Sequence, residues 1–371
     1  MKVTVLGTRG IPDVLGGVET HCQHLYPLIV KQGFEVEVIA RSPYVAYKTR
    51  SYKGVETKAL WAPKKTSLEA IVHSTIAAFS TLTDGSDVVH VHAIGPGLVV
   101  PLLRLIGKKV VFTHHGPDYQ REKWGKLAKI VLKLGERFAV KYANEVIVIS
   151  EVINDLIKQS YQRDDAHLIY NGVNPAKPLP VDVVSSILER YQLTARGYIV
   201  AVGRFVEEKG FHDLLQAYAK SKLDMPLVLI GDSDHESEYS HSLKQAANDT
   251  PGVILTGFLK GEELQVVFSQ AKLFVMPSYH EGLPIALLEA MSYSLPVVVS
   301  DIAPNSAVGL EPDGYFPVKD IDELSLAIQK RCVVPLQDYQ HFLERYDWHK
   351  IADQTVGVYN KMLGSKRDES S

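Results

Sequence analysis

Two glutamates, Glu281 and Glu289, are the residues of this chain whose spacing points most directly to chemistry. Pro284 favours the first turn of a helix, so we expect a helix from about Leu283, with Glu281 in the loop before it. Along such a helix the two carboxylates lie on the order of 12 Å apart, because each residue rises about 1.5 Å. The acid and the nucleophile of a retaining glycosidase stand about 5 Å apart, so this pair does not suit that chemistry. It suits two carboxylates that bind opposite ends of one ligand.

A pair of cations, Arg204 and Lys209, follows the predicted strand YIVAVG at 198–203. Ligands of parallel sheets bind at the carboxyl ends of the strands, which is where both residues lie. Arg is a forked donor and Lys is a point charge, a combination that binds a diphosphate. The alternative is two solvated surface charges, which their place at a strand end disfavours.

The turn GTRGIPDVLGGVET, after a predicted strand at 3–7, is a third candidate. Gly16 and Gly17 precede a predicted helix at 18–32. Glycines there let backbone N–H groups approach an anion at the helix N-terminus. The dinucleotide fingerprint and the P-loop motif are both absent from the sequence. A loop that needs two glycines only for flexibility explains the pattern equally well.

Short apolar runs and helical segments alternate regularly between these candidates. In the first half, strands are predicted at 3–7, 36–40, 87–93, 109–113 and 145–150, and helices at 18–32, 67–82 and 123–143. In the second half, strands are predicted at 198–203, 226–232, 252–257, 272–277 and 296–301, and helices at about 209–221, 235–248, 261–270, 283–293 and 320–331. Strands that alternate with helices predict parallel sheets covered by helices.

The Pro-containing segment 171–183 predicts a linker, and the net charge changes sign close to it. Residues 1–165 contain 22 Lys and Arg against 16 Asp and Glu, whereas residues 166–371 contain 18 against 27. We therefore expect an α/β fold of two doubly wound, Rossmann-like domains that face each other across a cleft. The expected domains are 1–172 and 173–348, with a helix at about 349–363 packing back on the first and a disordered tail at 365–371.

Composition excludes several classes of protein. The chain has 371 residues, of which 46% are hydrophobic and 22% charged, and the formal net charge is −3. These values are ordinary for a globular protein and exclude a chain-wide nucleic-acid binder. Two cysteines cannot form a disulfide framework, no apolar run is long enough to span a membrane, and the first residues do not match a signal peptide. We expect a cytoplasmic protein, at most peripheral on the inner face of the plasma membrane.

In their order and spacing, the Glu-x7-Glu element, the Arg-x4-Lys pair and the glycine loop resemble the retaining GT-B glycosyltransferases of family 4. The segments TRGIPDVLGGVET and HHGPDYQREKW are similar to bacterial members that build cell-surface polysaccharides, some of them rhamnosyl- or glucosyltransferases. The resemblance covers residues 1 to about 350. It implies transfer of a hexosyl group from a nucleotide diphosphate sugar to a glycan or lipid-linked acceptor, with retention of configuration. A UDP-sugar is favoured, and a GDP- or dTDP-sugar stays open.

The resemblance also implies a role for each matching residue. Arg204 and Lys209 would bind the donor diphosphate and stabilise the charge that develops on the leaving nucleotide. Glu281 would bind hydroxyls of the donor sugar and Glu289 those of the ribose, while His115 would lie beside the sugar. Further donor contacts would come from Gly16, Gly17, Phe258, Leu259, Gly282 and Leu283. No side-chain nucleophile, cofactor or metal is expected.

Two other patterns have less specific meanings. Asp232-Ser233-Asp234 is a D-x-D, the metal signature of the other large glycosyltransferase fold, but it follows a strand in the second half and we expect no metal there. The pair His114–His115 has no zinc-site spacing around it. His90 and His92 alternate along a strand, which is typical of satisfied core histidines.

Five cations recur at steps of three and four along the predicted helix 123–143 and so fall on one face: Lys126, Lys129, Lys133, Arg137 and Lys141. A separate apolar stripe is expected to pack inward: Trp124, Leu127, Val131, Leu134 and Phe138. The basic face is either a solvated helix surface or a docking surface for an anionic membrane, which gains up to about 1 kcal/mol per basic residue. Membrane docking suits a lipid-linked acceptor.

Two other functions stay open from the sequence. A sugar-nucleotide epimerase on the same fold needs acid and base groups at the sugar beyond Glu281 and His115. A non-catalytic sugar-nucleotide-binding subunit needs only the binding residues. An epimerase would change the donor sugar in the absence of an acceptor. A transferase would consume the donor only when an acceptor is present, and a binding subunit would leave the donor unchanged in both cases.

Overall fold

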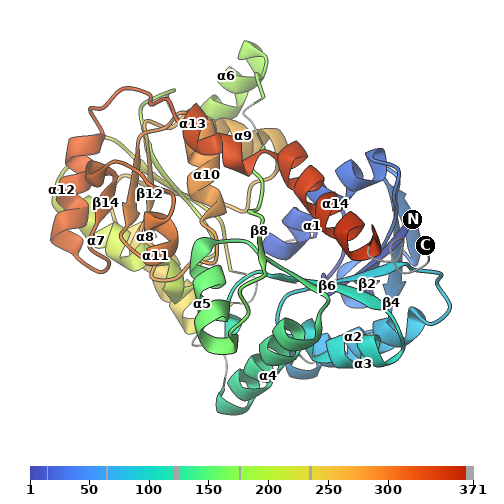
Figure 1. Ribbon diagram of the computed structural model, residues 1–371. Coiled ribbons are helices and arrows are strands. Elements are labelled where there is room, and N and C mark those ends of the chain that lie inside the picture. Colours follow the sequence, from blue (N-terminus) through green and yellow to red (C-terminus); the bar gives the residue numbers. More distant parts are fainter. Residues whose placement is uncertain (15, 64–65, 121–124, 175–176, 234–235, 365–371) are drawn as a thin grey trace. The chain divides into compact units, whose positions relative to one another are not determined.

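The computed structural model describes the whole chain except residues 15, 64–65, 121–124, 175–176, 234–235 and 365–371. The described residues form two compact units (Figure 1). The first unit combines Met1–Gly172 with Arg345–Ser371, and the second is the continuous segment Val173–Glu344. The tail predicted at 365–371 lies outside the described residues.

The first unit contains an eight-stranded sheet in the order β3-β4-β2-β1-β5-β6-β7-β8. Its strands are β1 Lys2–Leu6, β2 Glu35–Arg41, β3 Thr49–Tyr52, β4 Val55–Leu60, β5 Val88–His92, β6 Lys109–His114, β7 Glu145–Val148 and β8 His167–Leu168. The described neighbours are parallel, except that β3 and β4 pair antiparallel. They join through Lys53 and Gly54, whose φ angles of 49° and 85° are those of a tight hairpin turn. This hairpin was not predicted, because β3 is almost entirely polar and β4 alternates polar and apolar residues.

The helices of the first unit are α1 Gly17–Lys31, α2 Thr66–Ser80, α3 Val100–Leu105, α4 Lys126–Tyr142, α5 Glu151–Tyr161 and α14 Trp348–Gly364. Helix α14 follows the second unit in the chain and packs along α1 (Figure 1). Ile351 and Tyr359 of α14 share one apolar core with Leu25 of α1 and Val5 of β1. The C-terminal helix therefore completes the core of the first unit.

The second unit contains a six-stranded parallel sheet in the order β11-β10-β9-β12-β13-β14. Its strands are β9 Ile199–Val202, β10 Leu227–Ile230, β11 Val253–Gly257, β12 Leu273–Met276, β13 Val297–Ser300 and β14 Tyr315–Phe316. Its helices are α6 Val181–Arg190, α7 Phe211–Ser221, α8 Glu238–Asp249, α9 Gly261–Ser269, α10 Ile285–Ser292, α11 Ala303–Ser306, α12 Ile321–Arg331 and α13 Gln340–Leu343. The strands predicted in both halves are confirmed to within two residues at each end.

Each sheet has a point at which the order of its strands reverses. In the first unit this point lies between β1 and β5, and in the second it lies between β9 and β12. Ligands of doubly wound sheets bind outside the carboxyl ends of the strands at such switch points. The glycine loop follows β1, and Arg204 and Glu281 follow β9 and β12 respectively, so the fold places the predicted site residues at both switch points.

Helix α4 buries a different face from the one predicted. Leu127 and Leu134, expected to pack inward, are 76% and 40% exposed. Gly135, Glu136, Ala139 and Val140 are buried instead. Gly135 allows close packing, since a Cβ atom there would lie 2.1 Å from the carbonyl oxygen of Ile94. Val131 and Phe138 are half-buried, and Trp124 lies outside the described residues. Small residues and one paired glutamate form the buried face, which is why a search for large apolar residues missed it.

Both cysteines are buried free thiols. In the part of the chain that the structure describes, none of the helices combines the length and the apolar character needed to cross a bilayer.

Candidate functional site

Lys209, Glu281 and Ser278 meet at the switch point of the second unit. The Nζ atom of Lys209 donates to Oε1 of Glu281 at 2.6 Å, and the Ser278 hydroxyl donates to the same oxygen at 2.6 Å. The side chains of Lys209 and Glu281 are only 20% and 10% exposed, so the ion pair is largely shielded from water. Within the described residues, the other carboxylate oxygen of Glu281 makes no hydrogen bond and can accept one from a ligand.

Arg204 lies at the same edge of the sheet, two residues after the end of β9. Its guanidinium faces the carboxylate of Glu208 at 3.7 Å, and its side chain is 39% exposed. The two cations predicted to bind a diphosphate thus lie on one loop, each beside a carboxylate. The Arg204 guanidinium carries five N–H donors in a planar fork, a geometry that matches a phosphate.

Close backbone packing brings the Lys209 loop to the Glu281 loop. Gly210 has a φ of 66°, and a Cβ atom there would lie 2.2 Å from the carbonyl oxygen of Pro277. The backbone N–H of Tyr279 donates to the backbone oxygen of Glu208 at 2.8 Å, and the Tyr279 hydroxyl donates to the Asp213 carboxylate at 2.5 Å. A glycine is therefore required at position 210, and its approach to β12 sets the distance between Lys209 and Glu281.

Replacing Gly210 by alanine is expected to lower the free energy of unfolding by about 1–3 kcal/mol, because the left-handed backbone and the contact with Pro277 both resist a Cβ atom. Urea unfolding measures the change. Gly357→Ala is the matched control, since Gly357 lies inside α14 with open space around it, and alanine there should stabilise by about 0.5–1 kcal/mol. Equal effects of the two substitutions would contradict the packing argument.

Helix α10 begins at Ile285, two residues later than predicted, with Pro284 as its N-cap. Glu289 lies four residues into this helix, a rise of about 6 Å, and Glu281 lies in the loop before it, as predicted. The Glu289 side chain makes no hydrogen bond within the described residues. Burial raises the pKa of Glu289 to about 7. A carboxyl group in this state can bind a hydroxyl-bearing ligand.

The other predicted donor contacts of the second unit differ in their exposure. Gly282 and Leu283 are half-buried in the loop before α10. Phe258, just after β11, is 48% exposed, whereas Leu259 is only 5% exposed and belongs to the core. Leu259 therefore stays a predicted donor contact with a buried side chain, and Phe258 has an exposed ring that can stack on a base.

The D-x-D tripeptide is paired at its first residue. Asp232 accepts a bond from Lys244 Nζ at 2.7 Å, and this contact holds the pKa of Asp232 below its ordinary value. Asp234 lies outside the described residues.

Backbone geometry and Glu19 shape the glycine loop of the first unit. Glu19 is buried and accepts bonds from the Arg9 backbone N–H at 2.8 Å and the Thr8 hydroxyl at 3.3 Å. Gly16 has a φ of 143°, and a Cβ atom there would lie 2.0 Å from a carboxylate oxygen of Glu19. A Cβ atom at Gly17 would meet open space. Gly16 is thus needed for the turn, and Gly17 leaves the first turn of α1 accessible to an anion.

A chain of hydrogen bonds links His115 to the core of the first unit. His92 Nδ1 lies 2.8 Å from His115 Nε2, and the Tyr26 hydroxyl lies 2.5 Å from His92 Nε2. The Tyr26 and Tyr359 hydroxyls lie 3.1 Å and 2.6 Å from His90 Nδ1. His90 is thus a satisfied core histidine, as predicted, whereas His92 connects the core to His115.

Burial keeps these histidines neutral. It lowers the pKa of His21, which packs against the same group, to about 4 and the pKa of His90 to about 3. It also holds the pKa values of His92 and His115 well below the ordinary histidine value, and neighbouring rings add to the effect. His115 can therefore donate or accept a hydrogen bond at neutral pH without carrying charge.

His114 does not belong to the chain of hydrogen bonds that includes His115, and its side chain joins a separate network. Its Nε2 atom lies 2.8 Å from Glu136 Oε1, and Glu136 also accepts bonds from the hydroxyls of Tyr119 and Tyr161. These partners explain why α4 can bury a glutamate. The adjacent histidines 114 and 115 thus do not act as one pair.

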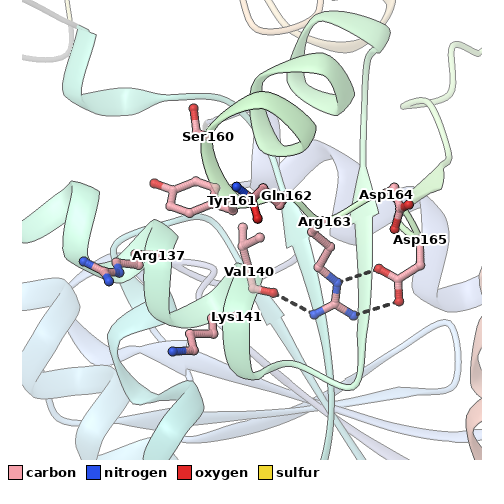
Figure 2. A pocket seen from close by; sticks show the side chains of 9 residues that line it. All are labelled: Arg137, Val140, Lys141, Ser160, Tyr161, Gln162, Arg163, Asp164 and Asp165. Carbon is pink, nitrogen blue, oxygen red and sulfur yellow. Dashed lines mark hydrogen bonds and ion pairs between the residues drawn. The ribbon is translucent and has the colours of Figure 1, made fainter.

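A shallow pocket of about 620 Å³ opens between the C-terminal ends of α4 and α5 (Figure 2). Arg163 lies in it and donates to the backbone oxygens of Val140 and Ala143 and to the carboxylate of Asp165. These bonds satisfy carbonyl groups at the end of α4. Arg137 and Lys141 of the basic face line the pocket, but the glycine loop and the histidines do not.

Two protein-family models match the chain. Residues 15–177 match the model described as Glycosyltransferase Family 4, and residues 190–331 match the model described as Glycosyl transferases group 1. The chain is a family 4 glycosyltransferase. Its activity is therefore the transfer of a sugar from a nucleotide sugar, and the expected family, fold and enzyme class are confirmed.

Curated relatives of this glycosyltransferase differ in the reaction that they catalyse. The Escherichia coli UDP-Gal:alpha-D-GlcNAc-diphosphoundecaprenol alpha-1,3-galactosyltransferase is 27% identical, covering 88% of this chain and 87% of the relative. The alpha-maltose-1-phosphate synthase of Mycolicibacterium smegmatis is 26% identical, covering 98% of this chain and all of the relative.

Solved structures show the same GT-B fold. The sucrose-phosphate synthase of Thermosynechococcus elongatus superposes with a TM-score of 0.83 at 22% identity, covering 98% of this chain and 99% of that one. HepE of Anabaena, in complex with UDP-glucose, superposes with a TM-score of 0.78 at 17% identity, covering 97% of this chain and all of that one.

Proposed function

We propose that this glycosyltransferase transfers a hexosyl group from a UDP-sugar, with retention of configuration, to a glycan or lipid-linked acceptor of cell-surface polysaccharide synthesis. The observation that carries the proposal is the shielded Lys209–Glu281 pair at the switch point of the second unit. The relative that is a UDP-Gal:alpha-D-GlcNAc-diphosphoundecaprenol galactosyltransferase, and the UDP-glucose complex of HepE, support UDP as the nucleotide.

In this proposal each charged group has a separate task. Lys209 and Arg204 bind the diphosphate, and Lys209 stabilises the negative charge that grows on it as the glycosidic bond breaks. The free oxygen of Glu281 accepts a hydroxyl of the donor sugar, while Lys209 and Ser278 hold the other oxygen. Glu289 accepts the ribose hydroxyls. In the first unit, neutral His115 contacts the sugar that is transferred, as the family resemblance implies.

A ligand screen followed by a transfer assay tests the proposal. Because a ligand stabilises the folded state in proportion to its affinity, UDP should raise the melting temperature more than GDP, dTDP or ADP does. UDP-hexoses are then incubated with lipid-linked glycan acceptors, and NMR of the product should show the donor's anomeric configuration. A donor altered without acceptor would indicate an epimerase, and donor binding without any transfer would indicate a non-catalytic subunit.

Donor affinity is expected to fall as the pH drops below about 7. Glu289 must be ionised to accept two hydroxyls, and its pKa is raised to about 7, so protonation competes with binding on the acidic side. One pH unit below the pKa, the affinity should be lower by up to about tenfold. Calorimetric titration with UDP-glucose between pH 6 and 8.5 measures the change. The Glu289→Gln variant should bind UDP-glucose more weakly at all pH values, and its affinity should not depend on pH. A wild-type affinity that did not change with pH would contradict the proposed role of Glu289.

We further propose that the outer face of α4 docks on an anionic membrane. Lys126, Lys133, Arg137 and Lys141 are exposed and Lys129 is half-buried. The apolar side chains of Leu127 and Ile130 lie among them, 76% and 63% exposed. Basic residues beside exposed large apolar ones are the composition of a helix that lies in the membrane interface. This surface would bring the enzyme to a lipid-linked acceptor.

Ile130→Ser is expected to reduce co-sedimentation with vesicles that contain anionic lipid, because it removes apolar area from the interface. Val333→Ser is the matched control, since Val333 is 80% exposed in the second unit. Lys126→Glu combined with Lys133→Glu should reduce binding further, and more so at low salt. Co-sedimentation that changed neither with the anionic lipid content nor with these substitutions would refute the docking surface.

A further inference from the structure

Three histidine rings of the first unit gather at its switch point. One ring nitrogen from each of His21, His92 and His115 lies within 4.8 Å of the other two. The ring centroids are 5.1 Å apart for His21 and His115, and 5.2 Å apart for His92 and His115. Three imidazole nitrogens at such separations resemble the ligand set of a three-histidine metal site.

Rigid elements hold all three rings. His21 lies in the second turn of α1, His92 is the last residue of β5, and His115 follows directly after β6. Strands β5 and β6 are hydrogen-bonded neighbours, with His92 opposite Thr113. Side chains on helices and strands are positioned more precisely than side chains on long loops. These elements fix the backbone of the group, so binding an ion requires only side-chain movement, in which the His21 nitrogen, now within 4.8 Å of the other two, has to approach them by up to about 1.5 Å.

An unsatisfied polar atom points to a ligand at this place. His21 is 4% exposed, and its Nδ1 atom has no hydrogen bond of good geometry among the described residues, although the Asn171 side chain lies close enough to interact with the ring. The side-chain oxygen of Asn171 and the indole nitrogen of Trp348, both close to His21, are buried and unsatisfied as well. Buried polar atoms are nearly always paired, so such a group indicates a place for water or an ion.

The surroundings of His92 have a second feature of metal ligands. Its Nε2 atom is 2.5 Å from the Tyr26 hydroxyl, which fixes the orientation of the ring. Histidines that bind metals almost always hold their other ring nitrogen in such a hydrogen bond. Tyr26 would thus support the ligand without touching the ion.

We propose that His21, His92 and His115 form a binding site for a transition-metal cation, and that Zn²⁺ suits it best. Imidazole nitrogens favour Zn²⁺, and three of them leave a fourth position for water. Zn–N bonds of about 2.0–2.1 Å in a tetrahedron place the nitrogens about 3.3–3.4 Å apart. His92 Nδ1 and His115 Nε2, now 2.8 Å apart, need to separate by only about 0.5 Å. The ion would replace the hydrogen bond between them.

A metal at this site has a consequence for catalysis, which rests on the proposed role of His115. The ion takes a ring nitrogen of His115 and changes the position and the charge of the group that contacts the sugar. Zn²⁺ is therefore expected to inhibit transfer, and a chelator is expected to restore it. This is the reverse of the behaviour of an enzyme that needs a metal, and it agrees with the expectation that the transfer reaction uses none.

The test uses the full-length protein freed of metal. Calorimetric titration with Zn²⁺ should show one ion per chain, and Co²⁺, added as a spectroscopic probe, should develop the visible absorption of a tetrahedral site. His21→Ala should weaken binding by about 100-fold or more, and Tyr26→Phe by about 10–100-fold. His24→Ala is the matched control and should bind as the wild type does. His24 lies on the same helix and stacks on Trp348, but it is outside the group.

Thermal unfolding without metal checks that each variant is folded, and His21→Gln replaces His21→Ala if the latter is not. Absence of the Co²⁺ absorption, or equal Zn²⁺ affinity in wild type and the His21 variant, overturns the metal site whatever the transfer assay shows. Binding without inhibition supports the site and removes the proposed role of His115. Metal-free protein that binds Zn²⁺ but transfers no sugar supports the site and counts against the proposed function.

Discussion

Replacing Lys209 by alanine is expected to lower kcat by about 10²–10³-fold while weakening donor binding much less. The Lys209 ammonium lies in a largely shielded position at the carboxyl end of β9, beside Glu281. A positive group fixed where negative charge develops stabilises the transition state more than the ground state, and loss of one such donor costs that much in rate. Steady-state kinetics with a UDP-sugar and an acceptor give kcat, and calorimetry gives the donor affinity.

Lys220→Ala is the control for this substitution. Lys220 lies on α7 of the same unit and pairs with Asp322 at the surface, where both side chains are more than half exposed. Such pairs contribute about 0–1 kcal/mol to stability and nothing to a site elsewhere. Kinetics of Lys220→Ala should match those of the wild type. An unchanged kcat in Lys209→Ala would remove Lys209 from the proposed chemistry.

Replacing Glu281 by glutamine is expected to lower kcat by at least about 100-fold without lowering the affinity for UDP. The amide keeps the size of the carboxylate but accepts hydroxyls more weakly, since hydrogen bonds to charged groups are about twice as strong. The carboxylate also neutralises Lys209 at 2.6 Å, so its loss frees that cation for the diphosphate. UDP should therefore bind as tightly or more tightly, while transfer slows.

These opposite changes separate a local effect from general damage. A distorted site would have both a lower UDP affinity and a lower kcat, whereas removal of the Glu281 charge should lower kcat alone. Glu263→Gln, on α9 of the same unit, is the matched control and should leave both unchanged. Weaker UDP binding by Glu281→Gln would show that Glu281 acts by holding the loop and not by contact with the sugar.

The order of strands and helices was predictable because each buried strand is a short apolar run. The hairpin of β3 and β4 was missed, since β3 is almost entirely polar, β4 alternates polar and apolar residues, and the turn depends on the backbone angles of Lys53 and Gly54. The start of α10 was placed two residues early because proline favours both the cap and the first turn of a helix. This error shifts the start of α10 but leaves Glu289 inside the helix and Glu281 in the loop before it, as predicted.

The candidate site was predictable only where its residues carry charge or follow a strand. Ser278, which holds Glu281, precedes it by three residues and could have been noticed as a hydroxyl beside a carboxylate. His21 could not, because a single histidine on α1 gives no sign that it meets β5 and β6. The close approach of Gly210 to Pro277 is likewise a contact between distant segments. Such partners depend on the topology of the sheet rather than on local pattern.

The basic face of α4 shows how a correct pattern can lead to a wrong packing. The cations were placed on one face correctly, but the helix is buried through Gly135 and its neighbours, so Leu127 stays in contact with solvent. The error has a functional meaning. Apolar side chains expected to stabilise the core are instead available at the surface, which strengthens the case for a membrane partner.

The return of α14 to the first unit reverses the order in which the two cores can be completed during translation. Tyr359 and the neighbouring residues of α14 are made only after the whole second unit, and until then the core that α1 shares with β1 and β2 lacks them. The second unit is one continuous segment, so its core is complete as soon as Glu344 has emerged. The core of the first unit is therefore completed after the core of the second unit. A ribosome that stalls before Trp348 leaves a folded second unit attached to a first unit whose core is incomplete.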